Sequence, residues 1–358
     1  MTLPYTELNR QLWPRTTEAA GYVIRPAKAD DVAPLDRLAD EAHRPPGARD
    51  PAVRSWRGGT EEPSVVVAEH SRTGALHAAF GTDPVRVCDQ EGVPLTFGRV
   101  STLLEHPASA QIDAPSLAIR CAWKHFDTFG GRNGQMVVYG SPSLEDLKLG
   151  RRDGAPGHAL DLEVIRVENL LRLPRARFRD LYAGFPQLTV TESPPGDRIT
   201  ALYEKVRVDW GASTVRDADW YRWRYEQRPD HEYRFAIVPG DDGTPRALTV
   251  GCIAKPPLPR SFLLLDWVCE PYDYDAGLAL LRWAIDQAEA ASCSEVATLL
   301  PDWTPWFTHL QWNGLTVHEA PWFTAAKAFL RARSGQWLRD RWFYTLGDLY
   351  LGSEGATP

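Results

Sequence analysis

The stretch 262–300 contains the arrangement in this chain that most resembles an anion-binding site. A predicted strand at 262–269 leads through a loop at 270–275 into a predicted helix from about 276 to 291, and a second strand follows at 295–300. A loop that opens a helix presents backbone N–H groups that suit a phosphate. The loop, however, carries acids where glycines and a basic residue would be expected, and Asp275 is predicted to cap the helix itself. We therefore expect this loop to repel an anion.

Other familiar reactive motifs are not found in the sequence. Residues 140–143 read Gly-Ser-Pro-Ser, which is not a nucleophile elbow, and no Walker loop is present. The pairs His70/His77 and His309/His318 lack the spacing to acids that a metal site needs, so no metal is expected. The five cysteines are widely spaced and without a CxxC pair, which favours reduced thiols over a disulfide framework.

Length and composition favour a globular protein of two domains. The chain has 358 residues, of which 43% are hydrophobic and 24% charged, and 358 residues are long for one core. The net charge of −7 argues against a nucleic-acid partner, which would need clustered Lys and Arg. No signal peptide and no membrane-spanning apolar stretch is recognised, so we predict a cytoplasmic protein without membrane contact.

The predicted elements occur twice in the same order. The first half has strands at 22–26, 64–69, 75–80, 96–104 and 135–139, with helices following 29–31 and at 114–129. The second half has helices near 197–207 and 217–227, a hairpin at 233–238 and 246–253, and then the unit at 262–300. We predict an arm at 1–20, two α/β domains at 21–186 and 187–350, and a flexible tail at 351–358.

The tryptophans of the second half allow two interpretations. Eleven of the 14 tryptophans lie between Trp210 and Trp342, and they build either the core or an aromatic-walled ligand cleft at Trp303/Trp306 and Trp220/Trp223. The basic run 172–179 is predicted to be a solvated inter-domain segment.

Several strings resemble the GCN5-related N-acetyltransferase (GNAT) superfamily in its tandem-domain bacterial form. Residues 22–31 are similar to the IRPA…ED opening of many members, and residues 140–150 resemble the stretch that ends in KLG. Residues 219–225 with Pro229, and residues 342–348, resemble two segments of one subgroup of tandem bacterial proteins. Together these strings cover about residues 21–350.

The resemblance implies a fold, a reaction and a set of partners. Each domain would be a mixed, mostly antiparallel twisted sheet flanked by helices, holding acetyl-CoA or another acyl-CoA in a V-shaped opening between two parallel strands. A small-molecule or sugar amine would attack the thioester directly, aided by a base, an acid for the thiolate and N–H groups that face the carbonyl oxygen. A monomer or homodimer is expected.

Carried over residue by residue, the resemblance places the site in the first half. Glu105 lies where many relatives have the general base, with a solvated strand-end carboxylate as the alternative. Tyr139 would be the acid, with a half-buried core tyrosine as the alternative. The residues predicted to hold the acyl-CoA are Leu103, Leu104, Ser109, Ala110, Gln111, Ile112 and Ser116.

The sequence departs from the family pattern in both halves. The family loop is rich in glycine, but the first-half loop at 106–116 has none, and the second-half loop at 270–277 has three acids. Asp146 and Leu310 stand where the family often has a thiolate-protonating tyrosine. A repurposed binding or scaffold protein is therefore the main alternative to an acyltransferase in which the second domain supports the first. Transfer from another donor, such as an aminoacyl-tRNA, is disfavoured by the acidic composition.

Overall fold

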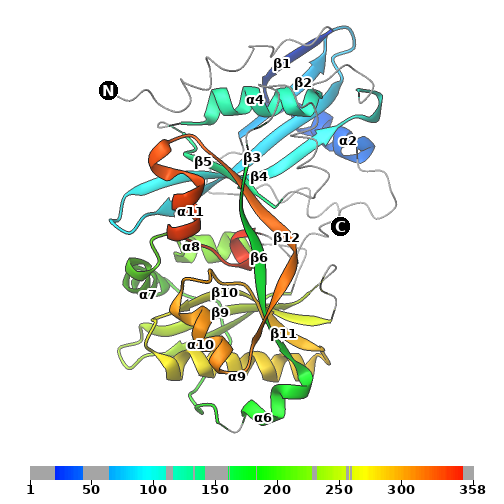
Figure 1. Cartoon of the computed structure of the whole chain (residues 1–358). Coiled ribbons are helices and arrows are strands. Elements are labelled where there is room, and N and C mark those ends of the chain that lie inside the picture. Colours follow the sequence, from blue (N-terminus) through cyan, green and yellow to red (C-terminus); the bar gives the residue numbers. More distant parts are fainter. Residues whose placement is uncertain are drawn as a thin grey trace. The chain divides into compact units, whose positions relative to one another are not determined.

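The computed structural model describes residues 21–42, 64–109, 116–131, 134–141, 160, 162–182, 184–227, 232–254, 258 and 260–349 (Figure 1). They belong to two compact units, each of which consists of three separate segments of the chain. Unit 1 comprises Met1–Arg86, Leu95–Arg166 and Thr324–Arg339, and unit 2 comprises Val87–Pro94, Val167–Phe323 and Asp340–Pro358. The sequence-based boundaries at 21–186 and 187–350 stay a prediction.

The sheet of unit 1 contains several antiparallel pairs of strands and one parallel pair. Its strands, in sheet order, are β1 (Tyr22–Pro26), β2 (Ser64–His70), β3 (Leu76–Cys88), β4 (Pro94–Glu105), β5 (Val137–Gly140) and the last part of β12 (Thr316–Ala328), which belongs to unit 1 from Thr324 on. β1 and β2 are antiparallel, as are β2 and β3, whereas β4 and β5 are parallel. The last strand comes from far along the sequence, because Ala325–Ala328 pair with Val137–Gly140.

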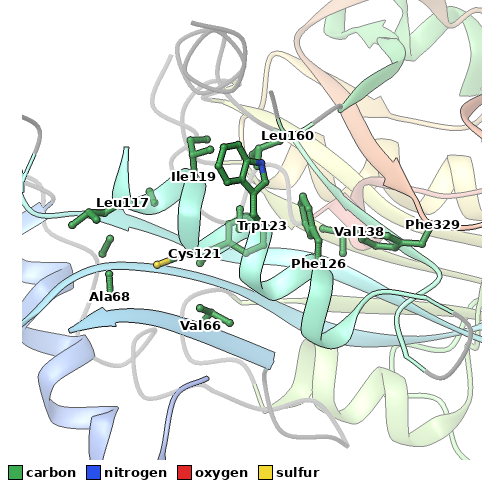
Figure 2. Close-up of a cluster of buried hydrophobic side chains, with 14 residues drawn as sticks. Val66, Ala68, Leu117, Ile119, Cys121, Trp123, Phe126, Val138, Leu160 and Phe329 are labelled. Atoms are coloured by element: carbon green, nitrogen blue, oxygen red, sulfur yellow. The ribbon is translucent and has the colours of Figure 1, made fainter. Parts of the chain in front are cut away.

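Two helices cover the two faces of this sheet. The helix α4 (Leu117–Phe129) packs on the face that carries Val66, Ala68, Ala78 and Phe80, as Figure 2 shows in part. The helix α2 (Val32–Ala42) packs on the opposite face, against Val67 and Ala79. Side chains alternate between the faces of a strand, and both faces of β2 and β3 are therefore apolar. Short 3-10 turns precede these helices, at Ala29–Asp31 and Pro107–Ser109.

Unit 2 repeats this plan. Its strands, in sheet order, are β8 (Arg234–Pro239), β9 (Pro245–Ile253), β10 (Ser261–Cys269), β11 (Glu295–Thr298) and the main part of β6 (Glu163–Pro174), which belongs to unit 2 from Val167 on. β8, β9 and β10 are successively antiparallel, and β10 and β11 are parallel. The helix α9 (Tyr274–Ala290) connects the parallel pair and covers one face of the sheet (Figure 1).

Shorter elements complete the described chain. They are α6 (Phe178–Tyr182), α7 (Ile199–Val206), β7 (Ala212–Thr214), α8 (Ala218–Tyr221), a π-helical turn (Arg222–Glu226), α10 (Pro305–Trp312), α11 (Gly335–Arg341), β13 (Trp342–Phe343), α12 (Leu346–Leu349) and 3-10 turns at Arg175–Arg177, Arg207–Asp209 and Arg331–Arg333. The predicted α/β class with a mostly antiparallel sheet flanked by helices is confirmed.

The basic run 172–179 is solvated in its larger part, because Arg175, Arg177 and Arg179 are exposed. Its first residues, however, belong to a strand, because Leu171–Pro174 pair antiparallel with Glu295–Thr298 inside the sheet of unit 2. Arg172 donates two hydrogen bonds to the Glu295 carboxylate, at 2.7 and 2.8 Å, and this pair compensates its charge.

The tryptophans of the second half mostly build its core. Seven of them are buried: Trp210, Trp220, Trp267, Trp283, Trp306, Trp322 and Trp342. The core interpretation is therefore the better one for most of these rings.

Candidate functional site

The parallel strands β4 and β5 of unit 1 lie side by side up to Gly140, where β5 ends. Register partners run from Phe97↔Val137 to Arg99↔Tyr139, after which β5 ends while β4 continues to Glu105. A Cβ on Gly140 would lie 3.3 Å from the Val100 Cβ, so the two strands are still close there. Beyond that point Val100–Leu103 of β4 are half-exposed. Unit 1 thus has a parallel pair beyond which β4 continues with half-exposed residues.

Glu105, the predicted general base, caps the helix that follows it. Its Oε1 accepts the Leu117 N–H at 3.0 Å, at the first residue of α4. Burial raises the pKa of the Glu105 carboxyl, and hydrogen bonds from Ser116 and from the backbone of Leu117 and Ala118 oppose that rise. The carboxylate therefore lies where a helix N-terminus would otherwise offer its amides to an anion.

The predicted acyl-CoA-binding residues separate into three groups. Leu103 packs with the α4 cluster, and Ser116 is the N-cap of α4, accepting the Ile119 N–H at 3.3 Å. Leu104 belongs to the cluster on the α2 face. Ser109 is buried and donates to the His106 carbonyl at 2.7 Å. Ala110, Gln111 and Ile112 lie outside the described residues, as does Asp146. The structure thus brings Glu105 and Ser116 to the start of α4, and Leu103 to the face of the sheet that α4 covers.

Tyr139, the predicted acid, lies in the closed part of the parallel pair. Only 1% of its surface is exposed, and its ring meets the Phe97 ring edge to face with centroids 6.4 Å apart. Val138 packs with the α4 cluster, so the alternation of the strand directs Tyr139 to the other face. The observed environment is that of a core tyrosine.

The helix N-terminus of unit 2 is capped in the same manner, although by a different residue than predicted. Asp273, not Asp275, is the N-cap of α9, and its Oδ1 accepts the Ala276 N–H at 3.3 Å. Arg246 donates to both Asp273 oxygens, at 2.6 and 2.9 Å. The helix starts two residues earlier than predicted, which places Asp275 in the first turn. The expectation that this loop disfavours an external anion stays a prediction.

The part of β10 beyond its register with β11 in unit 2 is covered by the chain itself. Register partners end at Leu264↔Thr298, and the remaining residues of β10 up to Cys269 are all buried. The C-terminal helix α12 packs on this strand, because a Cβ on Gly347 would lie 3.0 Å from the Leu265 carbonyl oxygen. In unit 1 the corresponding residues of β4 are half-exposed.

A buried ion network fixes this arrangement in unit 2. Arg216 contacts Asp266 of β10 at 2.9 Å and Asp348 of α12 at 2.6 Å, and the exposure of all three side chains is at most 1%. Burial raises the pKa of Asp266, which Arg216 opposes; burial acts to lower the pKa of Arg216, and the two carboxylates overcome that effect. Tyr221 donates to Asp266 at 2.6 Å. The space beside the end of β10 is thus occupied by side chains of unit 2.

Sequence reasoning missed one cluster of side chains near the start of α4. Three histidines, His70, His77 and His106, stack in a row beside Tyr22. The signal available in the sequence was that His70 directly follows a predicted strand, His77 is the third residue of the next one, and His106 lies two residues beyond a third. Within the described part of the chain no group of side chains is arranged to hold a metal ion.

Comparison with solved structures identifies the fold. The chain is similar to a conserved protein of unknown function from Enterococcus faecalis V583, a probable N-acyltransferase, with a TM-score of 0.60 and 13% identity over 86% of this chain and 73% of that one. It is also similar to GCN5-related N-acetyltransferases from Anabaena variabilis ATCC 29413 (TM-score 0.57, 11% identity, 86% and 73% covered) and Kribbella flavida (TM-score 0.57, 13% identity, 87% and 72% covered).

The chain therefore has the GNAT fold, as the sequence strings predicted. No protein-family model and no curated protein matches its sequence. No helix among the described residues is long and apolar enough to cross a membrane.

Proposed function

We propose that the chain is an acyl-CoA-dependent N-acyltransferase whose active site lies in unit 1. Acetyl-CoA is the proposed donor, and a small-molecule or sugar amine is the proposed acceptor. The observation that carries this proposal is the contrast between the two parallel pairs: β4 of unit 1 has half-exposed residues beyond Arg99, whereas β10 of unit 2 is buried throughout. The fold supports acyl transfer in general. Unit 2 has a supporting role in this proposal.

The proposed reaction is direct attack of the amine on the thioester. The nitrogen forms a bond to the acyl carbon, the carbon–sulfur bond breaks, and the thiolate leaves with the electron pair. Glu105 is the proposed base for the amine proton. Burial raises the pKa of its carboxyl, which makes the carboxylate a better proton acceptor near neutral pH. Tyr139 remains the proposed acid, although its burial requires a path to the leaving sulfur.

A second candidate, a binding or scaffold protein that has lost CoA, is favoured by one specific observation. The first amides of α4 are satisfied by the chain's own side chains, Leu117 N–H by Glu105 and Ile119 N–H by Ser116. A pyrophosphate in the usual position would have to displace the Glu105 carboxylate.

Thermal unfolding with acyl-CoAs and free CoA separates these two functions. A ligand at 100 times its Kd stabilises the folded protein by about 2.7 kcal/mol, and at 1,000 times by about 4.1 kcal/mol. We expect a rise in Tm of this origin with at least one acyl-CoA at millimolar concentration. The absence of a shift with the whole panel would leave the scaffold function.

The variant Glu105→Gln tests whether Glu105 is the base of the proposed reaction. Its amide oxygen can still accept the Leu117 N–H and preserve the cap, but it takes up no proton. We expect turnover to fall by a factor of about 100 or more, as for loss of a general base, with the thermal shift retained. Unchanged turnover would remove Glu105 from the base role.

A further inference from the structure

One edge of the sheet in unit 2 is paired over a short stretch. β8 is the last strand in the sheet order and pairs with β9 on one side, and on its other side an isolated bridge joins Ile237 to Thr191. The Ile237 N–H donates to the Thr191 carbonyl at 3.0 Å, and the Thr191 N–H donates to the Ile237 carbonyl at 2.8 Å. Backbone groups alternate between the two sides of an antiparallel strand, so the Phe235 N–H and carbonyl point to the same side as those of Ile237. For these two Phe235 groups no partner is found among the described residues.

The chain leaves this edge directly after the bridge. In the register that the bridge sets, the next pair along the edge would be Ser193 with Phe235. The described chain forms no bridge there, and Pro194 follows, which has no N–H to donate to a neighbouring strand. A cavity of about 480 Å³ lies at this place, lined by residues 192–194, 225–226 and 232–235. A strand position beside Phe235 is thus open to a ligand.

Acidic side chains outnumber basic ones around this cavity. Its lining includes three acids, Glu192, Glu226 and Glu232, and one basic residue, Arg234. The Arg234 guanidinium lies 3.4 Å from the Glu232 carboxylate and donates to the Gln287 side chain at 2.5 Å, so its charge compensates Glu232. For Glu192 and Glu226 no cationic partner is found in the described part of the chain. The cavity therefore favours a ligand that carries a positive charge.

Neutral hydrogen-bond donors hold the Glu192 carboxylate in place. Its Oε1 accepts the Trp283 indole N–H at 2.8 Å and the Gln287 amide at 2.9 Å, both from α9. These bonds fix the side chain without compensating its charge, and they leave Oε2 for a ligand. Glu192 is therefore a positioned anion at the wall of the cavity.

Aromatic rings supply the apolar part of the lining. The Tyr225 ring meets the Tyr233 and Phe235 rings edge to face, with centroids 5.0 and 6.2 Å apart. The nearest further cation is Arg224, whose guanidinium lies 4.9 Å from the Tyr225 ring centroid, but this side chain is buried and does not line the cavity. The methylene stem of a long basic side chain can pack on such rings while its charged end reaches a carboxylate.

We propose that this cavity binds an extended segment of a partner protein that carries a lysine or arginine side chain. The Phe235 N–H donates to a carbonyl of the segment, and the Phe235 carbonyl accepts an N–H from it, as in other cases where a peptide adds a strand to a sheet edge. Residues opposite each other in a sheet project to the same face, so the basic side chain opposite Phe235 lies on the face of the Phe235 ring, near Glu192 and Glu226. The inference concerns unit 2 and is independent of acyl transfer.

Fluorescence anisotropy with a labelled alanine peptide that has one central lysine tests this proposal. We expect saturable binding that weakens as salt is added, because salt screens exposed charges. The double variant Glu192→Gln/Glu226→Gln should bind about tenfold more weakly. An amide at position 192 can still accept the Trp283 N–H, so the variant keeps the hydrogen bonds of the fold while it loses the charge.

Asp241→Asn/Glu319→Gln is the matched control, because it removes the same charge from two exposed acids of unit 2 outside the cavity. The control should bind like the parent, and circular dichroism should show that all three proteins are folded. Equal affinity of the cavity variant and the control would overturn the proposal, as would a peptide that does not bind the parent.

Two further ligands test the main-chain pairing. A peptide whose central lysine carries a methyl group on its backbone nitrogen has lost the N–H for the Phe235 carbonyl, and it should bind at least about fivefold more weakly. Equal affinity of the methylated and the unmodified peptide would contradict pairing with β8. Butylamine should bind much more weakly than the peptide, and equal affinity would replace the proposed segment by a small amine.

Discussion

Arg216→Met is expected to lower the free energy of unfolding of unit 2 by about 3–5 kcal/mol. The substitution removes the only guanidinium that contacts both Asp266 and Asp348 in the described residues, at 2.9 and 2.6 Å. Both carboxylates are buried, so they would remain in the core as charges without the compensating guanidinium, or would have to take up protons. Urea unfolding followed by tryptophan fluorescence measures the loss.

Arg222→Met is the control for this prediction. Arg222 pairs with Asp219 at 2.5 Å, but 50% of the Arg222 side chain and 67% of the Asp219 side chain are exposed. Because water screens such a pair, the expected change is within about 1 kcal/mol. Equal losses for the two variants would show that the buried network does not hold the C-terminal helix on β10.

Trp267→Ala is expected to destabilise unit 2 by a similar amount, about 3–5 kcal/mol. Trp267 lies in the part of β10 beyond the register with β11, is 1% exposed, and packs on Trp306 with ring centroids 5.2 Å apart. Removing the indole leaves a cavity in a region where no external ligand is proposed. Loss of stability without any gain in acyl-CoA affinity is the expected combination.

Trp312→Ala provides the comparison for this tryptophan. Trp312 is 75% exposed at the end of α10, and its removal should change stability by about 0.5 kcal/mol or less. Acyl-CoA binding that appears in Trp267→Ala but not in Trp312→Ala would contradict the assignment of unit 2 to a supporting role.

Much of the fold could be predicted from the sequence because many helices and strands have a recognisable pattern of apolar residues. The strand at 22–26 was predicted at its observed bounds, and the strand and helix at 262–291 to within two residues. Apolar alternation and helical spacing are properties of a few neighbouring residues, so one sequence is enough to read them. The strings shared with the GNAT superfamily then supplied the arrangement of these elements.

The pairing of distant strands could not be predicted in this way. Leu171–Pro174 pair with Glu295–Thr298 of unit 2, and Ala325–Ala328 pair with β5 of unit 1. Nothing in the local pattern of 172–179 distinguishes a paired strand end from a solvated basic run, because the compensating Glu295 lies more than 100 residues away. Such contacts depend on tertiary structure.

The site was predicted in part. The sequence placed Glu105 at the end of its strand, but only the structure shows that its carboxylate caps α4. Asp273 and Asp275 are both suited to cap α9, and the choice between them depends on where the helix begins and on Arg246, which arrives from β9. The stacking of His70, His77 and His106 depends on how neighbouring strands pair, which spacing along the chain does not reveal.

Hydrogen–deuterium exchange with and without a saturating acyl-CoA tests the location of the proposed active site most directly. We expect protection in peptides that cover Val100–Glu105 of β4 and the first turn of α4, because most residues of this part of β4 are half-exposed. Peptides from β10 should show no change, because that strand is already buried by the chain itself. Protection confined to β10 and α9, with β4 unaffected, would contradict an active site in unit 1.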